Sequence, residues 1–245
     1  MHRLLLTVLM TASVPLAALA QPAEEPVFAG ASVCGGFPPI DNGPHDYRSI
    51  RDNRLGKVER YHFTPNVERL VKGESTSVIG ADISFTLRHF PNHHRALVSM
   101  SRLAEREKTV QVNGSEFSVD CWFDRALRFA RDDTVSRLLF ADHLHRTKRP
   151  IAAAAQVDHA VTLAGDNPLA HYNAGLIYLD LKKYDQARQQ AYRAEELGVK
   201  RTGLRDRLRQ AGQWREPASP APSTAASGSL PVPAAIASPA PAASR

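Results

Sequence analysis

Apolar and polar residues alternate along residues 168–197 with the period of two amphipathic helices joined by a short polar turn. Small residues, Gly175, Ala187 and Ala194, stand where these two helices have to touch. A single helix pair of this kind cannot bury its apolar side alone, because it offers too little apolar area. We therefore expect further helices to pack beside it, in an all-α fold.

Small and large apolar residues stand at defined positions in this segment. With Pro168 as position 1, they are Gly175 at position 8, Tyr178 at 11, Tyr184 at 17, Ala187 at 20, Ala194 at 27 and Leu197 at 30. This pattern resembles the tetratricopeptide repeat (TPR) family, whose unit is a helix-turn-helix of 34 residues. The resemblance implies an array in which the first helix of each unit lines a concave groove for an extended peptide or a partner helix.

A second unit is predicted one period earlier, with Thr134 at position 1. Ala141, Ala153 and Ala160 again place small residues where the family needs close helix approach. Pro150 replaces the aromatic residue of position 17, and it is tolerated there because a proline at the start of a helix costs no hydrogen bond. The two units together predict four consecutive helices.

A third, more divergent unit is predicted over residues 90–130, where two helical apolar stripes follow each other. Aligning Pro91 with Pro168 puts His94 opposite His171, at a site that packs between helices. This alignment gives His94 a packing role rather than a chemical one.

The third unit carries an insertion between its two helices. Residues 109–116 contain the turn signal Asn113-Gly114 and alternating valines, which favour a small hairpin. At the other end, residues 203–213 predict a capping helix that covers the last apolar side of the array. Residues 91–213 are thus interpreted as about three TPR-like repeats with a capping helix.

The preceding part of the mature chain, residues 21–90, does not match the repeat. Residues 34–46 are dense in Gly and Pro and are expected to be irregular. Short helices are predicted at 64–72, which has a good start and a glycine stop, and at 82–89.

The two ends of the chain are predicted to lie outside the folded part. Residues 1–20 combine a basic start, an apolar run too short to span a membrane and an Ala-x-Ala cleavage site, so they predict a signal peptide. Residues 214–245 consist almost entirely of Pro, Ala, Ser and other small residues, which predicts a disordered tail that is either a tether or a tolerated extension. These features predict a periplasmic or secreted protein without a membrane span.

The distribution of charge bears on the class of partner, and the cysteine content bears on the cellular compartment. The sequence has 31 Lys and Arg against 25 Asp and Glu, a formal net charge of +6, and its basic residues are scattered rather than grouped in a stripe. We therefore predict no nucleic-acid partner, and contact with an anionic envelope polymer stays open. The two cysteines, Cys34 and Cys121, predict a disulfide bond in an oxidising compartment.

Histidines are the best candidates for metal binding or catalysis. His89 and His93 have the i, i+4 spacing of two ligands on one helix face, but Pro91 stands between them and interrupts the helix. His93 and His94 point about 100° apart on a helix. No metalloprotease, nucleophile-elbow, phosphate-loop or dinucleotide motif accompanies them. The sequence therefore predicts no enzyme, metal or cofactor, with an envelope enzyme or metal protein near His89 and His93 as the alternative.

The TPR resemblance also implies which side chains face the groove. They are Leu169, Tyr172, Leu176, Leu179 and Asp180 in the clear repeat and Val135, Leu138, Asp142, His145 and Arg146 in the one before it. One TPR subtype clamps a C-terminal carboxylate with an asparagine at position 9, where this sequence has Leu176 and Asp142, so that ligand is not expected. His143 is expected at the surface or in the groove.

The predicted function is that of an exported adaptor that binds a protein or peptide through this groove, in envelope assembly or secretion. An open groove would leave Tyr172 and Leu176 exposed. The alternative is that the N-terminal segment packs into the groove.

Overall fold

The computed structural model describes residues 33–38, 43–50 and 53–216 of the chain. The predicted signal peptide and residues 217–245 of the predicted tail lie outside this part. By internal contacts the chain divides into two units, residues 1–214 and 215–245.

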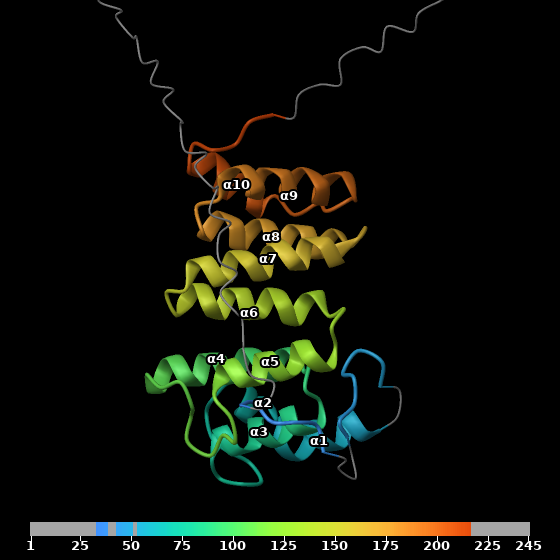
Figure 1. Ribbon diagram of the computed structural model, residues 1–245, viewed down its shortest axis with the longest axis vertical. Coiled ribbons are helices and arrows are strands. Elements are labelled where there is room, and N and C mark those ends of the chain that lie inside the picture. Colours follow the sequence, from blue (N-terminus) through green and yellow to red (C-terminus); the bar gives the residue numbers. More distant parts are fainter. Residues whose placement is uncertain (1–32, 39–42, 51–52, 217–245) are drawn as a thin grey trace, which may run out of the picture. The chain divides into compact units, whose positions relative to one another are not determined.

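The described part of the chain is all-α, as predicted, with ten helices (Figure 1). They are α1 (Arg54–His62), α2 (Pro65–Glu68), α3 (Ile79–His89), α4 (His94–Glu107), α5 (Val119–Phe129), α6 (Thr134–Arg146), α7 (Pro150–Ala164), α8 (Pro168–Asp180), α9 (Tyr184–Glu196) and α10 (Gly203–Gln210). In this part of the chain, no helix has the length and the apolar character that crossing a membrane requires.

Local sequence signals explain where the longer helices begin. His93, Ser118, Asp133 and Asn167 precede α4, α5, α6 and α8, and each side chain accepts a hydrogen bond from a backbone N–H of the first turn. A proline opens α2, α7 and α8, where its fixed φ suits the first turn.

Successive helices pack against one another in chain order (Figure 1). α6 packs against α7, α7 against α8 and α8 against α9, and α10 packs on both α8 and α9. α6 and α8 begin 34 residues apart, and so do α7 and α9, so the two units predicted in this region are helix pairs of equal spacing. α4 and α5 form a further pair with a longer connection.

Two apolar clusters form the core. One joins α3, α4 and α5 to parts of α6 and α7 around Trp122 and Phe140, and the other joins α6 to α10 around Tyr178 and Leu204. Gly175 lies at a close contact in the second cluster, because a Cβ at this position would lie 2.4 Å from Leu204 Cδ2 and 3.3 Å from the Ala187 carbonyl oxygen. The capping helix α10 therefore lies directly on α8.

The N-terminal part is more helical than its sequence predicts. α1 was not predicted, because its sequence is mostly polar and only Val58 is buried, so no apolar stripe marks it. The helix predicted at 64–72 is the single turn α2, which is followed by Leu70 with a φ of 61°. The helix predicted at 82–89 is present as α3 and begins at Ile79.

The hairpin predicted in the insertion is wrong. Residues 109–118 form a loop without strands, in which Asn113 and Gly114 make the predicted turn and Gly114 has a φ of 77°. Val112 points into the core and Val110 is exposed, so the two valines do alternate, but they have no partner strand in the described loop.

The predicted alignment of the third unit is wrong by three residues. α4 begins at His94, so His94 aligns with Pro168, and Leu97 rather than His94 aligns with His171. The physical reason is that Pro91 lies in the turn before the helix, whereas Pro168 is the first residue of α8.

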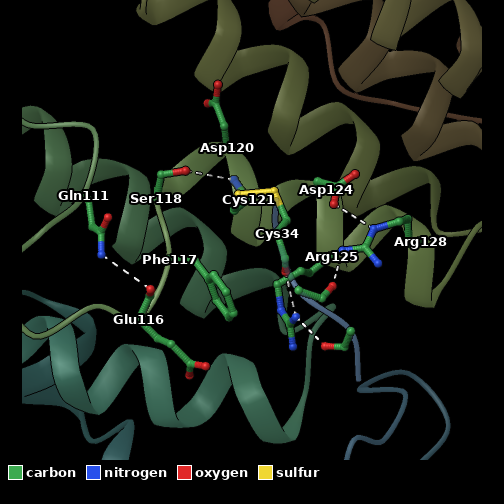
Figure 2. Close-up of a disulfide and its surroundings, with 12 residues drawn as sticks. Cys34, Gln111, Glu116, Phe117, Ser118, Asp120, Cys121, Asp124, Arg125 and Arg128 are labelled. Carbon is green, nitrogen blue, oxygen red and sulfur yellow. Dashed lines mark hydrogen bonds and ion pairs between the residues drawn. A yellow bond between two sulfur atoms is a disulfide. The ribbon is translucent and has the colours of Figure 1, made fainter. Parts of the chain in front are cut away.

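Cys34 and Cys121 form the predicted disulfide bond, with an S–S distance of 2.03 Å and Cα atoms 5.0 Å apart (Figure 2). The bond ties the N-terminal segment to the first turn of α5. Its presence agrees with the oxidising compartment that the cysteine pair predicts.

Candidate partner-binding face

Five charged side chains form a band across the first helices of the array. Arg146 of α6 pairs with Glu105 of α4 through two hydrogen bonds and lies 4.0 Å from Asp142 of its own helix. Asp180 of α8 pairs with Arg207 of α10 at 2.5 Å. We call these five residues the charged band, and three of them, Asp142, Arg146 and Asp180, are among the predicted groove residues.

The carboxylate of Asp142 lies close enough to the Arg146–Glu105 pair and to Asp180 for their charges to shift its pKa. Burial raises the pKa of Asp142, Arg146 opposes this effect, and the carboxylates of Glu105 and Asp180 add to it. The side chains of the band are between 32% and 50% exposed. Ion pairs at such exposure contribute little to stability, so a partner can exchange them at small cost.

Val135 and Leu169 add apolar surface to the same side of α6 and α8. They are 39% and 46% exposed, respectively. Each stands three helical turns before a band residue, Val135 before Arg146 and Leu169 before Asp180, so each pair lies within about 20° around its helix. The face therefore combines two exposed apolar side chains with charges of both signs.

The other predicted groove residues are less exposed. Leu138 and Leu179 are buried in the core, and His145 is half-buried. Tyr172 and Leu176, which an open groove would expose, are half-buried in the apolar cluster that includes α10. α10 covers them because it packs on α8 where a further first helix would follow in a longer array.

The N-terminal helices cover the α4 end of this face. Arg95 of α4 pairs with Glu68 of α2 at 3.0 Å, and the Ser99 hydroxyl donates to the Glu68 carbonyl. Arg106 donates to the carbonyl of Leu70 at 2.6 Å. The N-terminal segment thus packs on the α4 part of the face, whereas the charged band continues over α6, α8 and α10.

A cavity of about 480 Å³ opens beside the charged band, between the ends of α4 and α6 and the start of α5. Ala104, Val110 and Val119 give it an apolar lining. Its polar lining residues are Glu105, Lys108, Thr109, Asp120, His143, Thr147 and Arg149. Because Glu105 belongs to both, the cavity and the charged band are continuous.

His143, which was expected at the surface or in the groove, is instead buried in the wall of this cavity. Its Nδ1 lies 2.8 Å from the Ser101 hydroxyl oxygen, and its Nε2 lies 3.1 Å from Asp120 Oδ1. Arg149 donates to both oxygens of Asp120, at 2.5 and 2.9 Å. Burial acts to raise the pKa of Asp120, but the hydrogen bonds from His143 and Arg149 outweigh it and hold that pKa well below its ordinary value.

Ser101, His143 and Asp120 are hydrogen-bonded in the same order as the Ser–His–Asp triad of a hydrolase. In such a triad the serine hydroxyl has to be accessible to the substrate. Ser101 is buried and does not belong to the cavity lining, whereas His143 and Asp120 do. The three side chains therefore fix the wall of the cavity and do not present a nucleophile to it.

One of the candidate histidines, His94, lies at a polar junction between the N-terminal segment and the helices. At its centre is the carboxylate of Asp133, the N-cap of α6, which accepts a hydrogen bond from Asn92 and lies 2.9 Å from His94 Nε2. Asn92 also donates to Asp46, at 2.8 Å. The turn before α4, the turn before α6 and the N-terminal segment therefore meet at one buried carboxylate, and we call this group the Asp133 junction.

His89 and His93 each have separate partners. His93 Nδ1 accepts a hydrogen bond from the Ala96 backbone N–H at 3.1 Å, and its Nε2 lies 3.1 Å from Glu59. His89 Nδ1 lies 2.8 Å from the Phe85 carbonyl oxygen. Among the residues that the structure describes, no group of three or more His, Cys, Asp or Glu side chains is placed to hold a metal ion.

We expect the free energy of unfolding to fall as the pH drops below about 6.5, with a contribution from His93. Burial lowers the pKa of His93 more than the carboxylate of Glu59 raises it. Below pH 6.5 the unfolded chain then binds a proton that the folded chain does not, so stability decreases by at most about 1.4 kcal/mol per pH unit for this group. Urea unfolding of wild type and His93→Asn between about pH 5 and 7 measures this slope.

Asparagine keeps a side-chain oxygen for the N-cap of α4 but does not titrate. The slope of stability against pH is expected to be shallower in His93→Asn, and an unchanged slope would contradict the assignment to His93.

Two members of the charged band, Glu105 and Arg207, are missing from the sequence-based prediction. With α4 in its observed register, Glu105 stands at position 12, which is a groove position in the TPR pattern. The residue that caps α4 is His93, and histidine is not one of the preferred cap residues, so no strong local signal marks this register. No sequence signal marked Arg207 as part of this face, because α10 is not part of a predicted repeat.

Comparison with protein-family models, curated proteins and solved structures gave no match for this chain. The functional interpretation therefore starts from the face and the cavity themselves.

Proposed function

We propose that this chain is an exported, TPR-type adaptor that binds a protein or peptide through the charged band and the adjoining cavity. One observation carries the proposal: the band extends over α4, α6, α8 and α10 and meets the cavity at Glu105. The equal spacing of the α6–α7 and α8–α9 pairs supports the TPR-type arrangement. The disulfide supports a periplasmic or secreted location.

The chemistry of this surface suggests what the partner presents. The apolar lining from Ala104, Val110 and Val119 suits one apolar side chain. The band offers three carboxylates and two guanidinium groups, which suits a segment that carries charges of both signs. An extended peptide or a helix laid across successive first helices would meet both features, as in other helix-groove interactions.

We expect the double variant Val135→Glu, Leu169→Glu to lose its partner. Both side chains are exposed, so the substitutions place two carboxylates on the face without disturbing the core. A mismatched charge at an interface costs about 1.4 kcal/mol or more, which corresponds to at least a tenfold loss of affinity. Affinity capture from an extract of cells that make the protein, quantified by mass spectrometry, measures the loss.

Ile151→Glu is the matched control. Ile151 is 83% exposed and lies on α7, a second helix, so the same chemical change is made away from the proposed face. A polypeptide that wild type and Ile151→Glu recover equally, and that the double variant recovers about tenfold less, supports the proposal. If all three folded proteins recover the same set, the face is not the binding surface.

Variants at Tyr172 or Leu176 are less suitable for this test. Both side chains pack against α10 in the core cluster. Their replacement would lower stability as well as change the surface, so a loss of binding would have two explanations.

A further inference from the structure

Among the residues that the structure describes, Arg125 of α5 is a buried cation without an ion pair. It is 4% exposed. The two carboxylates that act on its charge are engaged elsewhere, Asp124 with Arg128 at 2.7 Å and Glu116 with Arg88 at 3.7 Å. Burial lowers the pKa of Arg125, as it does for a charge that lacks a close counter-ion. Burying such a charge is unfavourable unless a partner compensates it.

The hydrogen bonds of Arg125 use only one end of its guanidinium group. Nη1 donates to the backbone carbonyls of Cys34 and Gly36, at 2.9 and 2.7 Å (Figure 2). Nε is buried without a hydrogen-bond partner, and among the described residues Nη2 makes no hydrogen bond either. Nε has almost no accessible surface, so a ligand cannot reach it, whereas Nη2 is not among the buried atoms. Nη2 is therefore the unpaired donor of Arg125 that a carboxylate can contact.

Arg125 also lines a cavity of about 250 Å³ next to the disulfide. Two aromatic rings of the same lining lie close to its guanidinium carbon, Phe37 at 4.7 Å and Phe117 at 4.6 Å from the ring centroids. Arg88 brings a second positive charge to the lining, and Glu116 brings a negative one. The cavity thus combines an unpaired cation with apolar walls.

We propose that this cavity binds a carboxylate, which pairs with Nη2 of Arg125 while its attached apolar group lies against Phe37 and Phe117. Nη1 keeps its role of holding residues 34–36 on α5, and the ligand supplies the missing counter-ion. Glu116 opposes binding because it brings a like charge to the same cavity. The carboxylate belongs either to a small organic acid or to the end of a peptide, which present the same group to Arg125.

This site is independent of the charged band. It is built from α5, the adjoining loop and the N-terminal segment, and it shares no lining residue with the cavity at Glu105. An experiment that contradicts one proposal therefore does not contradict the other.

Isothermal titration of the full mature chain with benzoate tests the site, with benzamide as the uncharged control of the same shape. Benzoate is expected to bind, and benzamide to bind at least about tenfold more weakly, because it lacks the charge that Arg125 pairs with. Glu116→Gln is expected to bind benzoate about two- to fivefold more tightly, because a like charge is removed from a partly exposed position. Equal binding of benzoate and benzamide, or no binding by either wild type or Glu116→Gln, would overturn the proposal.

Arg125→Lys keeps the positive charge but removes the planar guanidinium group, and with it the Nη2 donor. We expect its affinity for benzoate to fall at least about tenfold, and unchanged affinity would count against the site. If this variant does not fold, the Glu116→Gln and benzamide comparisons decide the question without it.

Two further titrations separate the sources of the carboxylate. One uses a short peptide with a free C-terminus, and the other uses the same peptide with an amidated C-terminus. Tighter binding of the free peptide than of benzoate assigns a peptide end, whereas binding of benzoate alone assigns a small acid. Equal binding of both peptides would contradict recognition through a terminal carboxylate.

Discussion

Replacing both Cys34 and Cys121 by alanine is expected to lower the free energy of unfolding by up to about 4–5 kcal/mol. The disulfide closes a ring across a sequence separation of 87 residues. Without it the unfolded chain gains the conformational freedom of that whole ring, which favours unfolding. Both cysteines are buried, and alanine fits in their place without an unpaired polar group. Urea unfolding followed by circular dichroism measures the difference.

Reduction of the wild-type protein provides the control. The reduced wild type and the double alanine variant are expected to have similar midpoints, both lower than that of the oxidised protein. A double variant that is as stable as the oxidised protein would show that the N-terminal segment is held by its other contacts, such as those of Arg125 and Arg128.

Asp133→Ala is expected to lower the free energy of unfolding by about 3–5 kcal/mol, because it removes one partner from a buried charged group. The carboxylate is 1% exposed and receives hydrogen bonds from Asn92 and from the backbone and hydroxyl of Ser136, with His94 at 2.9 Å. Burial acts to raise the pKa of Asp133, but His94 and the other hydrogen bonds lower it overall, so the group is ionised when folded. Its loss leaves several polar groups buried without partners. Thermal and urea unfolding measure the effect.

The neighbouring residue offers a matched control for this prediction. Asp132 has a side chain that is 76% exposed and pairs with Arg48 at the surface. Asp132→Ala is therefore expected to cost at most about 1 kcal/mol. Equal effects of the two substitutions would show that the Asp133 junction does not link the helices as described.

The helices that the sequence predicts best are those with local signals. α8 and α9 have apolar periodicity, a cap at Asn167 and small residues at the close contacts, and both are present with the expected spacing. These signals act within one or two turns of a helix, so a single sequence displays them. α1 has no apolar stripe, and the start of α4 has no strong cap residue. Both depend on tertiary packing, and for that reason α1 was missed and the register of α4 was misplaced.

The residues of the candidate sites also divide into those that local sequence signals predict and those that depend on tertiary packing. Asp142, Arg146 and Asp180 were predicted because their helices are in register with the repeat. The two cavities were not predicted, because each is lined by residues that lie far apart in the chain. Arg125, for example, contacts the carbonyl of Cys34, which lies 91 residues earlier. Similarly, His94 pairs with Asp133 across 39 residues, a contact that the sequence did not indicate.

The disulfide has a consequence for cleavage of the backbone. The ring that it closes contains α1, α2, α3 and α4 in their entirety, together with the loop between α2 and α3. In that loop Val71 is 67% exposed, so a protease can reach it. A cut there, or at any other bond inside the ring, leaves the two fragments covalently joined through Cys34 and Cys121. The chain can therefore be nicked in its N-terminal half and still remain one molecule.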